Sequence, residues 1–121
     1  MTIGLLLGVG LAGGLGAIGR FLVDGSVARR AASAFPLGTL AVNLSGAFLL
    51  GVLVGATLSS DAFRLAGTGL IGAYTTFSTW AFESHRLGEE GQLRLGALNF
   101  AVSLVAGVLV AWLGRKVGAA L

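Results

Sequence analysis

The sequence predicts an all-α integral membrane protein with four transmembrane helices. Of its 121 residues, 55% are hydrophobic and 11% are charged, and the mean hydropathy is +0.92. Soluble domains carry about 25% charged residues, so the composition argues against a soluble globular class. The 21 glycines are typical of closely packed transmembrane helices. One proline, no cysteine and no polar linker indicate a single four-helix domain, residues 1–121, without disulfides or thiolate metal sites.

Four apolar segments account for the predicted helices, with expected bounds at about residues 3–23, 36–58, 65–85 and 95–114. Each is long enough for the roughly 20 residues that cross the hydrocarbon core. The short connections between the segments hold nearly all the charge. The first segment has no basic residue before it, so we do not expect a cleaved signal peptide.

The third segment contains an unusually polar stretch, residues 72–80 (GAYTTFSTW). Four of five consecutive residues from position 75 carry hydroxyl groups: Thr75, Thr76, Ser78 and Thr79. In lipid, irregular backbone is tolerated only where protein buries it or water reaches it. The stretch predicts a helix that breaks near residues 72–79, and discontinuous helices of this kind form ion sites. A Ser/Thr-rich helix that packs on its neighbours would explain the same composition.

Polar residues also lie along the second and fourth segments. Thr39 and Asn43 are one helical turn apart, about 6 Å along the axis, and Asn99 and Ser103 have the same spacing. Such groups either mark a pathway or bond across a helix interface. No Asp, Glu, Lys or His lies at mid-membrane. A pathway would therefore offer neutral donors and aromatic ring edges, which suits the passive movement of a small anion.

Several other sequence patterns do not indicate a binding or catalytic site. Residues 8–13 match G-x-G-x-x-G, but they lack the preceding strand and the later acidic residue of a nucleotide site, so they favour close helix packing. His85 stands alone, and Ser78 has no histidine or aspartate partner in the membrane, so we expect neither a metal cluster nor an enzyme. The net charge of +3 comes from residues beside the apolar segments, which indicates contact with membrane lipid and not with nucleic acid.

The basic residues give the chain little preference for one orientation. Four helices place both termini on one side, with Arg64, Arg115 and Lys116. The opposite side holds five arginines: Arg20, Arg29, Arg30, Arg86 and Arg94. Because five against three is a weak bias, we expect insertion both ways round. Four helices are too few to enclose a pathway easily, so we expect an oligomer. An antiparallel dimer would have the inverted symmetry that larger transporters obtain from internal repeats.

Three stretches, in order, resemble the small fluoride channels called Fluc or CrcB: residues 13–20 (GGLGAIGR), 38–43 (GTLAVN) and 72–79 (GAYTTFST). The resemblance covers nearly the whole chain. It implies a passive fluoride-selective ion channel that exports fluoride and lowers its cytoplasmic concentration. It also implies a multi-pass protein of the prokaryotic plasma (cell inner) membrane, assembled as a dual-topology antiparallel homodimer with a structural Na⁺ at the dimer axis.

The resemblance also assigns roles to residues of the fluoride pathway. Asn43 matches the pore asparagine, Phe77 matches the first of two pore phenylalanines, and Ser103 matches a pore serine. Arg20 matches the family arginine near the aqueous vestibule. Together with the hydroxyl run and its flanking aromatic residue, the expected fluoride pathway comprises Asn43, Phe77, Ser78, Thr79, Trp80, Ser103 and Arg20.

Gly72 and Thr75 match the positions whose backbone carbonyls hold the sodium ion. The sequence departs from the family at three positions. Trp80 replaces the second pore phenylalanine, Asn99 stands where some members have tyrosine, and Gly107 stands where some have a second serine.

Two alternatives to a self-sufficient channel stay open, and the departures favour the first of them. One is a paralogous subunit that requires a second homologue, in a heterodimer, before it conducts. The other is a small multidrug-type transporter, which is less expected because such carriers need a glutamate inside the first helix. The first acidic residue here is Asp24, at the end of that segment.

Overall fold

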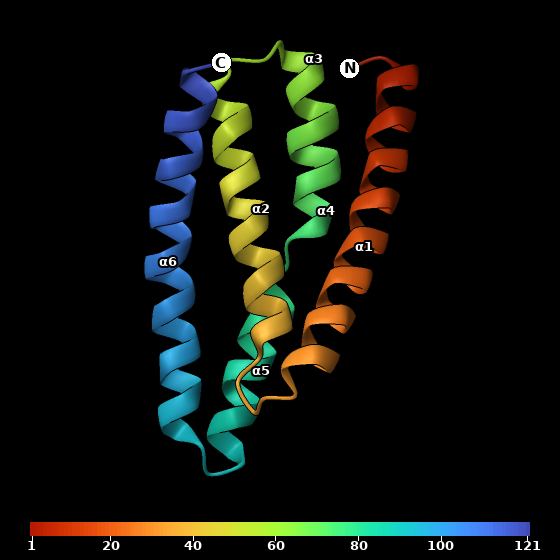
Figure 1. The fold of residues 1–121 in the computed structure, drawn as a ribbon. Coiled ribbons are helices and arrows are strands. Elements are labelled where there is room, and N and C mark those ends of the chain that lie inside the picture. Colours follow the sequence, from red (N-terminus) through yellow and green to blue (C-terminus); the bar gives the residue numbers. More distant parts are fainter.

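The computed structural model describes residues 1–121 as four helical rods that lie side by side (Figure 1). This confirms the all-helical class and the four-helix count. Three rods are single helices: α1 (Ile3–Ala31), α2 (Leu37–Gly55) and α6 (Leu93–Ala119). The third rod is built from α3 (Ser60–Phe63), a π-helical stretch η1 (Arg64–Ile71), α4 (Gly72–Tyr74) and α5 (Phe77–Glu89).

The helices begin and end at different residues from those that the apolar segments predict. α1 continues beyond residue 23 to Ala31. Two arginines lie in its last turn, where their positive charge interacts favourably with the negative end of the helix dipole. α2 ends at Gly55 instead of residue 58, because Thr57 has a positive φ of 52°. α6 is longer than expected at both ends. Apolar segments mark the part of a helix inside lipid, whereas backbone hydrogen bonding continues into the charged flanks.

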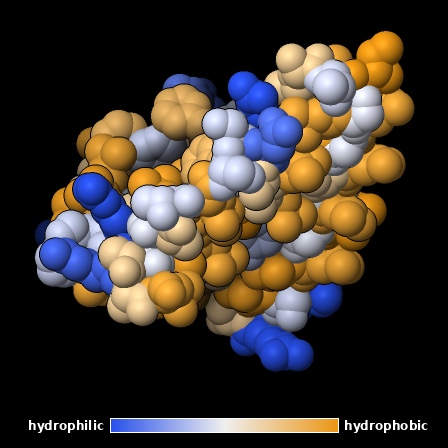
Figure 2. Space-filling view, turned by 90° about the horizontal axis from the view of Figure 1, so that it is seen from above, coloured by the Kyte–Doolittle hydropathy of each residue, from blue (hydrophilic) through white to orange (hydrophobic).

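Three of the rods, α1, α2 and α6, are long and apolar enough to cross a membrane. The pieces of the third rod are each shorter than the roughly 20 residues that a span needs, although together they run the length of the bundle (Figure 1). Only 16 of 121 residues are buried. Apolar side chains cover most of the rim in the end-on view, as expected for a surface in contact with lipid or another chain (Figure 2).

The break lets the third rod change neighbours. Its first half, η1 and α4, packs against α1, whereas its second half, α5, packs against α6. α2 contacts both halves, so the break lies beside α2. Both chain termini lie at one end of the bundle (Figure 1).

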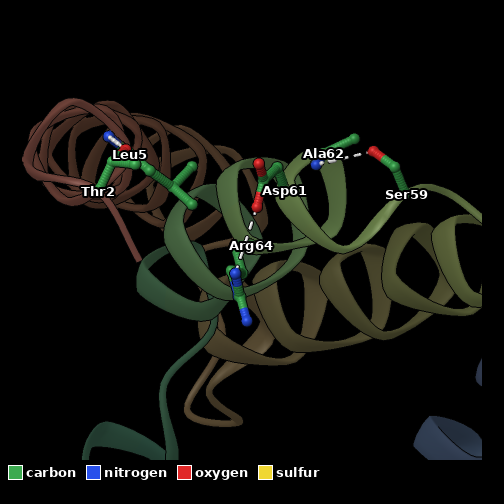
Figure 3. A network of polar contacts seen from close by, with 6 residues as sticks. All are labelled: Thr2, Leu5, Ser59, Asp61, Ala62 and Arg64. Carbon is green, nitrogen blue, oxygen red and sulfur yellow. Dashed lines mark hydrogen bonds and ion pairs between the residues drawn. The ribbon is translucent and has the colours of Figure 1, made fainter.

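Short-range polar contacts lie at the end of the bundle that carries the termini (Figure 3). Thr2 and Ser59 each accept, through the side-chain oxygen, a hydrogen bond from the N–H three residues later, at 3.1 and 3.3 Å. These caps start α1 and α3. Arg64 donates to Asp61 at 3.2 Å, but both side chains are exposed, so this ion pair contributes little to stability.

Glycines allow α2 and α6 to approach each other closely. Gly51 and Gly55 of α2 face backbone carbonyls of α6, and Gly114 and Gly118 of α6 face backbone carbonyls of α2 in return. Each pair has the small-xxx-small spacing that transmembrane helices use for close contact. A Cβ atom at any of the four positions would collide with the backbone of the other helix.

Replacing Gly51 with alanine should therefore destabilise the protein. The new Cβ would meet the carbonyl of Ala111, which is backbone and cannot rotate away, and overpacking of this kind costs about 1–3 kcal/mol. The unfolding midpoint in detergent measures the effect. Gly10→Ala is the matched control, because a Cβ there meets no atom within 4 Å. Equal midpoints for the two variants would contradict the packing role of Gly51.

Candidate functional site

The third rod breaks at Thr75 and Thr76, inside the range 72–79 that the sequence predicts. Thr75 has a ψ of 160° and Thr76 a φ of −145°, so both residues are extended between α4 and α5. Thr76 Oγ1 accepts a hydrogen bond from the Thr79 N–H at 3.2 Å and caps α5. Thr75 Oγ1 donates to the Ile71 carbonyl at 3.2 Å. The hydroxyl run thus ends one helix and starts the next.

The Asn43 side chain of α2 forms hydrogen bonds with the backbone at the break. Its Oδ1 accepts the Thr76 N–H at 2.8 Å, and its Nδ2 donates to the Thr76 carbonyl at 2.9 Å. Both backbone groups of Thr76 are thereby paired, as backbone at membrane depth requires. The amide has a second N–H that these bonds do not use, so Asn43 keeps one donor for a ligand. The bridge to Thr76 is a structural role that the sequence pattern does not reveal.

An open groove of about 310 Å³ lies at the break. It brings together four of the expected pathway residues, Asn43, Phe77, Trp80 and Ser103, with Thr75. Its eleven lining residues are Asn43, Gly46, Ala47, Leu50, Thr75, Thr76, Phe77, Trp80, Ser103, Leu104 and Gly107. None of them is ionisable, so the groove offers neutral polar groups and aromatic rings only.

The remaining expected pathway residues lie outside this groove. Arg20 and Thr79 line a separate cavity of about 190 Å³, which Asp24 also lines. Thr76 lines both openings and lies between them. Ser78 lines neither, and its hydroxyl lies 3.4 Å from that of Thr76. Of the seven expected pathway residues, four therefore line the groove, two line the separate cavity, and Ser78 lies at the surface.

Trp80 forms the wall of the groove on the side of α6. Its side chain is 6% exposed, and its indole N–H donates to the Asn99 backbone carbonyl at 3.3 Å. The ring stacks on Phe100 with centroids 4.8 Å apart, and it meets Phe77 edge-on at 5.2 Å. The indole N–H is thus engaged with the protein and is not available to an anion.

Comparison with known proteins identifies the family of this chain. Residues 7–115 match the family described as CrcB-like protein, Camphor Resistance (CrcB). The chain belongs to the CrcB family. This confirms the resemblance inferred from the sequence, and the chain is accordingly a multi-pass membrane protein and not an enzyme.

Named relatives of this CrcB chain are similar over nearly their full length. The "Fluoride-specific ion channel FluC 2" of Mycolicibacterium paratuberculosis is 57% identical over 95% of this chain and 94% of the relative. The protein of the same name from Mycobacterium tuberculosis is 55% identical over 95% of this chain and 91% of its own. The "Fluoride-specific ion channel FluC" of Acidobacterium capsulatum is 45% identical over 93% and 94%, respectively.

Several backbone carbonyls of this CrcB chain are released at the break, among them those of Gly72 and Thr75. The N–H four residues after Gly72 belongs to Thr76 and bonds Asn43, and the N–H four residues after Thr75 belongs to Thr79 and bonds the Thr76 hydroxyl. The carbonyls of Gly72 and Thr75 thus lose their usual helical donors. Unwound carbonyls at the end of a half-helix fit a sodium ion. The chain has no group of three or more His, Cys, Asp or Glu side chains that could hold a metal.

Two carboxylates that the sequence places at the ends of its segments lie inside helices. Glu83 of α5 accepts a hydrogen bond from the buried hydroxyl of Thr39. Asp24 of α1 contacts Gly38 of α2, and Asp24, Glu83 and Arg86 line a third cavity of about 200 Å³. The apolar segments do not reveal these contacts, because each contact joins residues that are far apart along the chain. The helix-favouring residues Ala28, Arg29, Arg30 and Ala31 are the signal that could have revealed the longer α1.

Proposed function

We propose that this CrcB-family chain is a passive, fluoride-selective ion channel that exports fluoride across the prokaryotic plasma (cell inner) membrane. The groove at the break is the observation that carries the proposal, because its eleven lining residues include hydrogen-bond donors and aromatic rings but no ionisable group. The names of relatives at 45–57% identity support the choice of anion.

The chemistry of the groove suits uncoupled movement of a small, strongly hydrated anion. Hydrogen fluoride crosses membranes as a neutral acid and dissociates in the cytoplasm, so a passive exit for fluoride lowers its cytoplasmic concentration. The free N–H of Asn43, the hydroxyl of Ser103 and the ring edge of Phe77 replace water around the anion. Proton-coupled carriers instead place carboxylates or histidines in their pathways.

The working unit in this proposal is a dual-topology antiparallel homodimer. Two observations support a second copy beside the groove: Phe77 lines it while remaining 74% exposed, and only 16 of 121 residues are buried within one chain. A second chain would cover Phe77 and enclose the open side of the groove. The weak bias of basic residues between the two ends, five against three, supports insertion in both orientations.

A structural Na⁺ at the dimer axis completes the proposal. The carbonyls of Gly72 and Thr75 would hold it, since both lack their helical donors. When bound, the ion would supply positive potential near the break, which favours an anion in the groove.

Fluoride efflux from liposomes that contain only this purified chain tests the function, with a fluoride electrode as the readout. We expect fast efflux without a proton gradient and without chloride release, and protein-free liposomes give the background. Efflux that requires a proton gradient would contradict a passive channel. No efflux from folded protein, with efflux restored by a second homologue, would identify the chain as a subunit of a heterodimer.

A further inference from the structure

The outer side of α6 is an apolar face that no other helix of the chain covers. α6 forms one edge of the bundle (Figure 1). Gly114 faces the Phe48 carbonyl of α2. Val105 and Trp112 precede Gly114 by nine and two positions, which places them on the opposite side of the helix. Two shallow grooves of about 360 and 330 Å³ lie on this outer side, and their entirely apolar linings share Val105 and Leu109.

A cation lies at the end of this apolar face. Trp112 follows Leu109 by three residues and is 55% exposed. Lys116, one turn further, places its Nζ 5.5 Å from the centroid of the Trp112 ring. A cation within about 6 Å of an indole ring is attracted by its π electrons. The ring therefore holds the ammonium group beside the apolar face, which the methylene groups of a lysine can also follow.

Lys116 has no carboxylate partner within the chain. The three ion pairs of the structure join other residues. Asp61 is the only acidic side chain on the side of the membrane that holds the termini, and it pairs with Arg64. The positive charge of Lys116 is thus free for an anion from outside the chain.

The length of the outer face of α6 matches one leaflet of a bilayer. Lys116 follows Val105 by eleven positions, a rise of about 16 Å along the helix axis. Half of the hydrocarbon core is about 15 Å thick. Val105 lies between Ser103 and Gly107, which line the groove at the break in the middle of the bundle (Figure 1). The face thus runs from the middle of the membrane to the level of the headgroups, where tryptophan and lysine are common.

We propose that the outer side of α6 binds an anionic phospholipid. The ammonium group of Lys116, held on the Trp112 ring, binds the negatively charged headgroup, and an acyl chain lies in the grooves at Val105 and Leu109. Anionic headgroups attract basic side chains near the membrane surface, whereas a zwitterionic lipid fits the grooves but offers no net charge to Lys116. The second copy of the chain proposed above covers Phe77, on the groove side of α6, and so leaves this outer side to lipid.

Quenching of tryptophan fluorescence by phospholipids with brominated acyl chains tests this proposal. The purified chain is reconstituted with brominated phosphatidylglycerol or brominated phosphatidylcholine, in about 0.15 M salt to weaken diffuse attraction. The chain has two tryptophans, and the other one, Trp80, is buried. The Trp112→Leu variant gives the Trp80 signal, which is subtracted. We expect phosphatidylglycerol to associate at Trp112 roughly fivefold more strongly than phosphatidylcholine.

Lys116→Gln should abolish this preference, because it removes the charge and leaves the apolar face intact. Arg115→Gln is the matched control. It removes the same charge one position away, where the α6 backbone packs against Gly51 of α2, and it should keep most of the preference. Both side chains are exposed, so neither substitution should prevent folding.

Equal quenching of Trp112 by the two lipids would overturn the proposal. Equal losses of preference in Lys116→Gln and Arg115→Gln would also overturn it, because they would indicate diffuse attraction and no site at Lys116. Weak quenching by both lipids would show that protein, such as a second copy of the chain, covers this side of α6, and would count against lipid binding there. None of these outcomes depends on whether the chain transports fluoride.

Discussion

Replacing Asn43 with aspartate should lower fluoride efflux by about 100-fold. The carboxylate can still accept the Thr76 N–H, but it cannot donate to the Thr76 carbonyl, and an unpaired buried group costs about 1–3 kcal/mol. The negative charge would also repel fluoride in the groove that Asn43 lines. Initial rates of efflux from liposomes measure the loss, with Gln92→Glu as the control because it makes the same amide-to-acid change at an exposed position.

The pH dependence of the Asn43→Asp variant separates the two roles of the amide. A protonated carboxyl can donate to the Thr76 carbonyl while accepting the Thr76 N–H, as the amide does, and it carries no charge. Efflux by the variant should therefore recover as the pH falls, after subtraction of the background from protein-free liposomes. Wild-type rates for Asn43→Asp at neutral pH would remove Asn43 from the pathway.

Removing the Thr76 hydroxyl should abolish the stabilisation that the proposed sodium ion would give. The hydroxyl caps α5 by accepting the Thr79 N–H, and this cap helps to keep Thr75 extended, with its carbonyl outside the helix and available to the proposed sodium ion. Loss of the cap itself costs about 1 kcal/mol. A bound ion present at a hundred times its Kd contributes about 2.7 kcal/mol, so the unfolding midpoint of the wild-type protein should rise when Na⁺ replaces K⁺.

The midpoint of Thr76→Ala should be nearly the same in the two salts. Thr76→Ser keeps the capping oxygen and is the matched control, so its midpoint should still rise in Na⁺. A sodium response that survives in Thr76→Ala would rule out the Thr75 carbonyl as a ligand. A wild-type protein with equal midpoints in Na⁺ and K⁺ would contradict the structural sodium altogether.

Much of the architecture is predictable from the order of residue types. The four apolar segments predict four helices, and the hydroxyl run after Gly72 predicts the break that the structure has at Thr75 and Thr76. Both signals are local, because lipid selects long apolar segments and a cluster of hydroxyls offers the backbone partners outside the helix. The exact ends of the helices are less predictable. Apolar residues indicate which part of a helix lies in lipid, whereas backbone hydrogen bonds determine where the helix ends.

The partners of the site residues are less accessible to sequence reasoning because they are far apart along the chain. Asn43 bridges to Thr76 across 33 positions, and Trp80 reaches Asn99 across 19. The resemblance to a family places Asn43 and Ser103 on a pathway, but it does not indicate that the Asn43 amide pairs the backbone of the break. It also does not indicate that Arg20 and Thr79 line a different cavity from Phe77.

The sequence by itself thus determined the membrane class, the four helices, the family and the position of the break, because each depends on residues that are neighbours in the chain. Only the tertiary structure decided which hydrogen-bond donors remain free at that break. A donor is free or engaged according to the acceptors that packing brings within about 3 Å of it. In this chain α2 supplies the amide that closes the break, and α5 supplies the indole N–H that bonds the Asn99 carbonyl of α6.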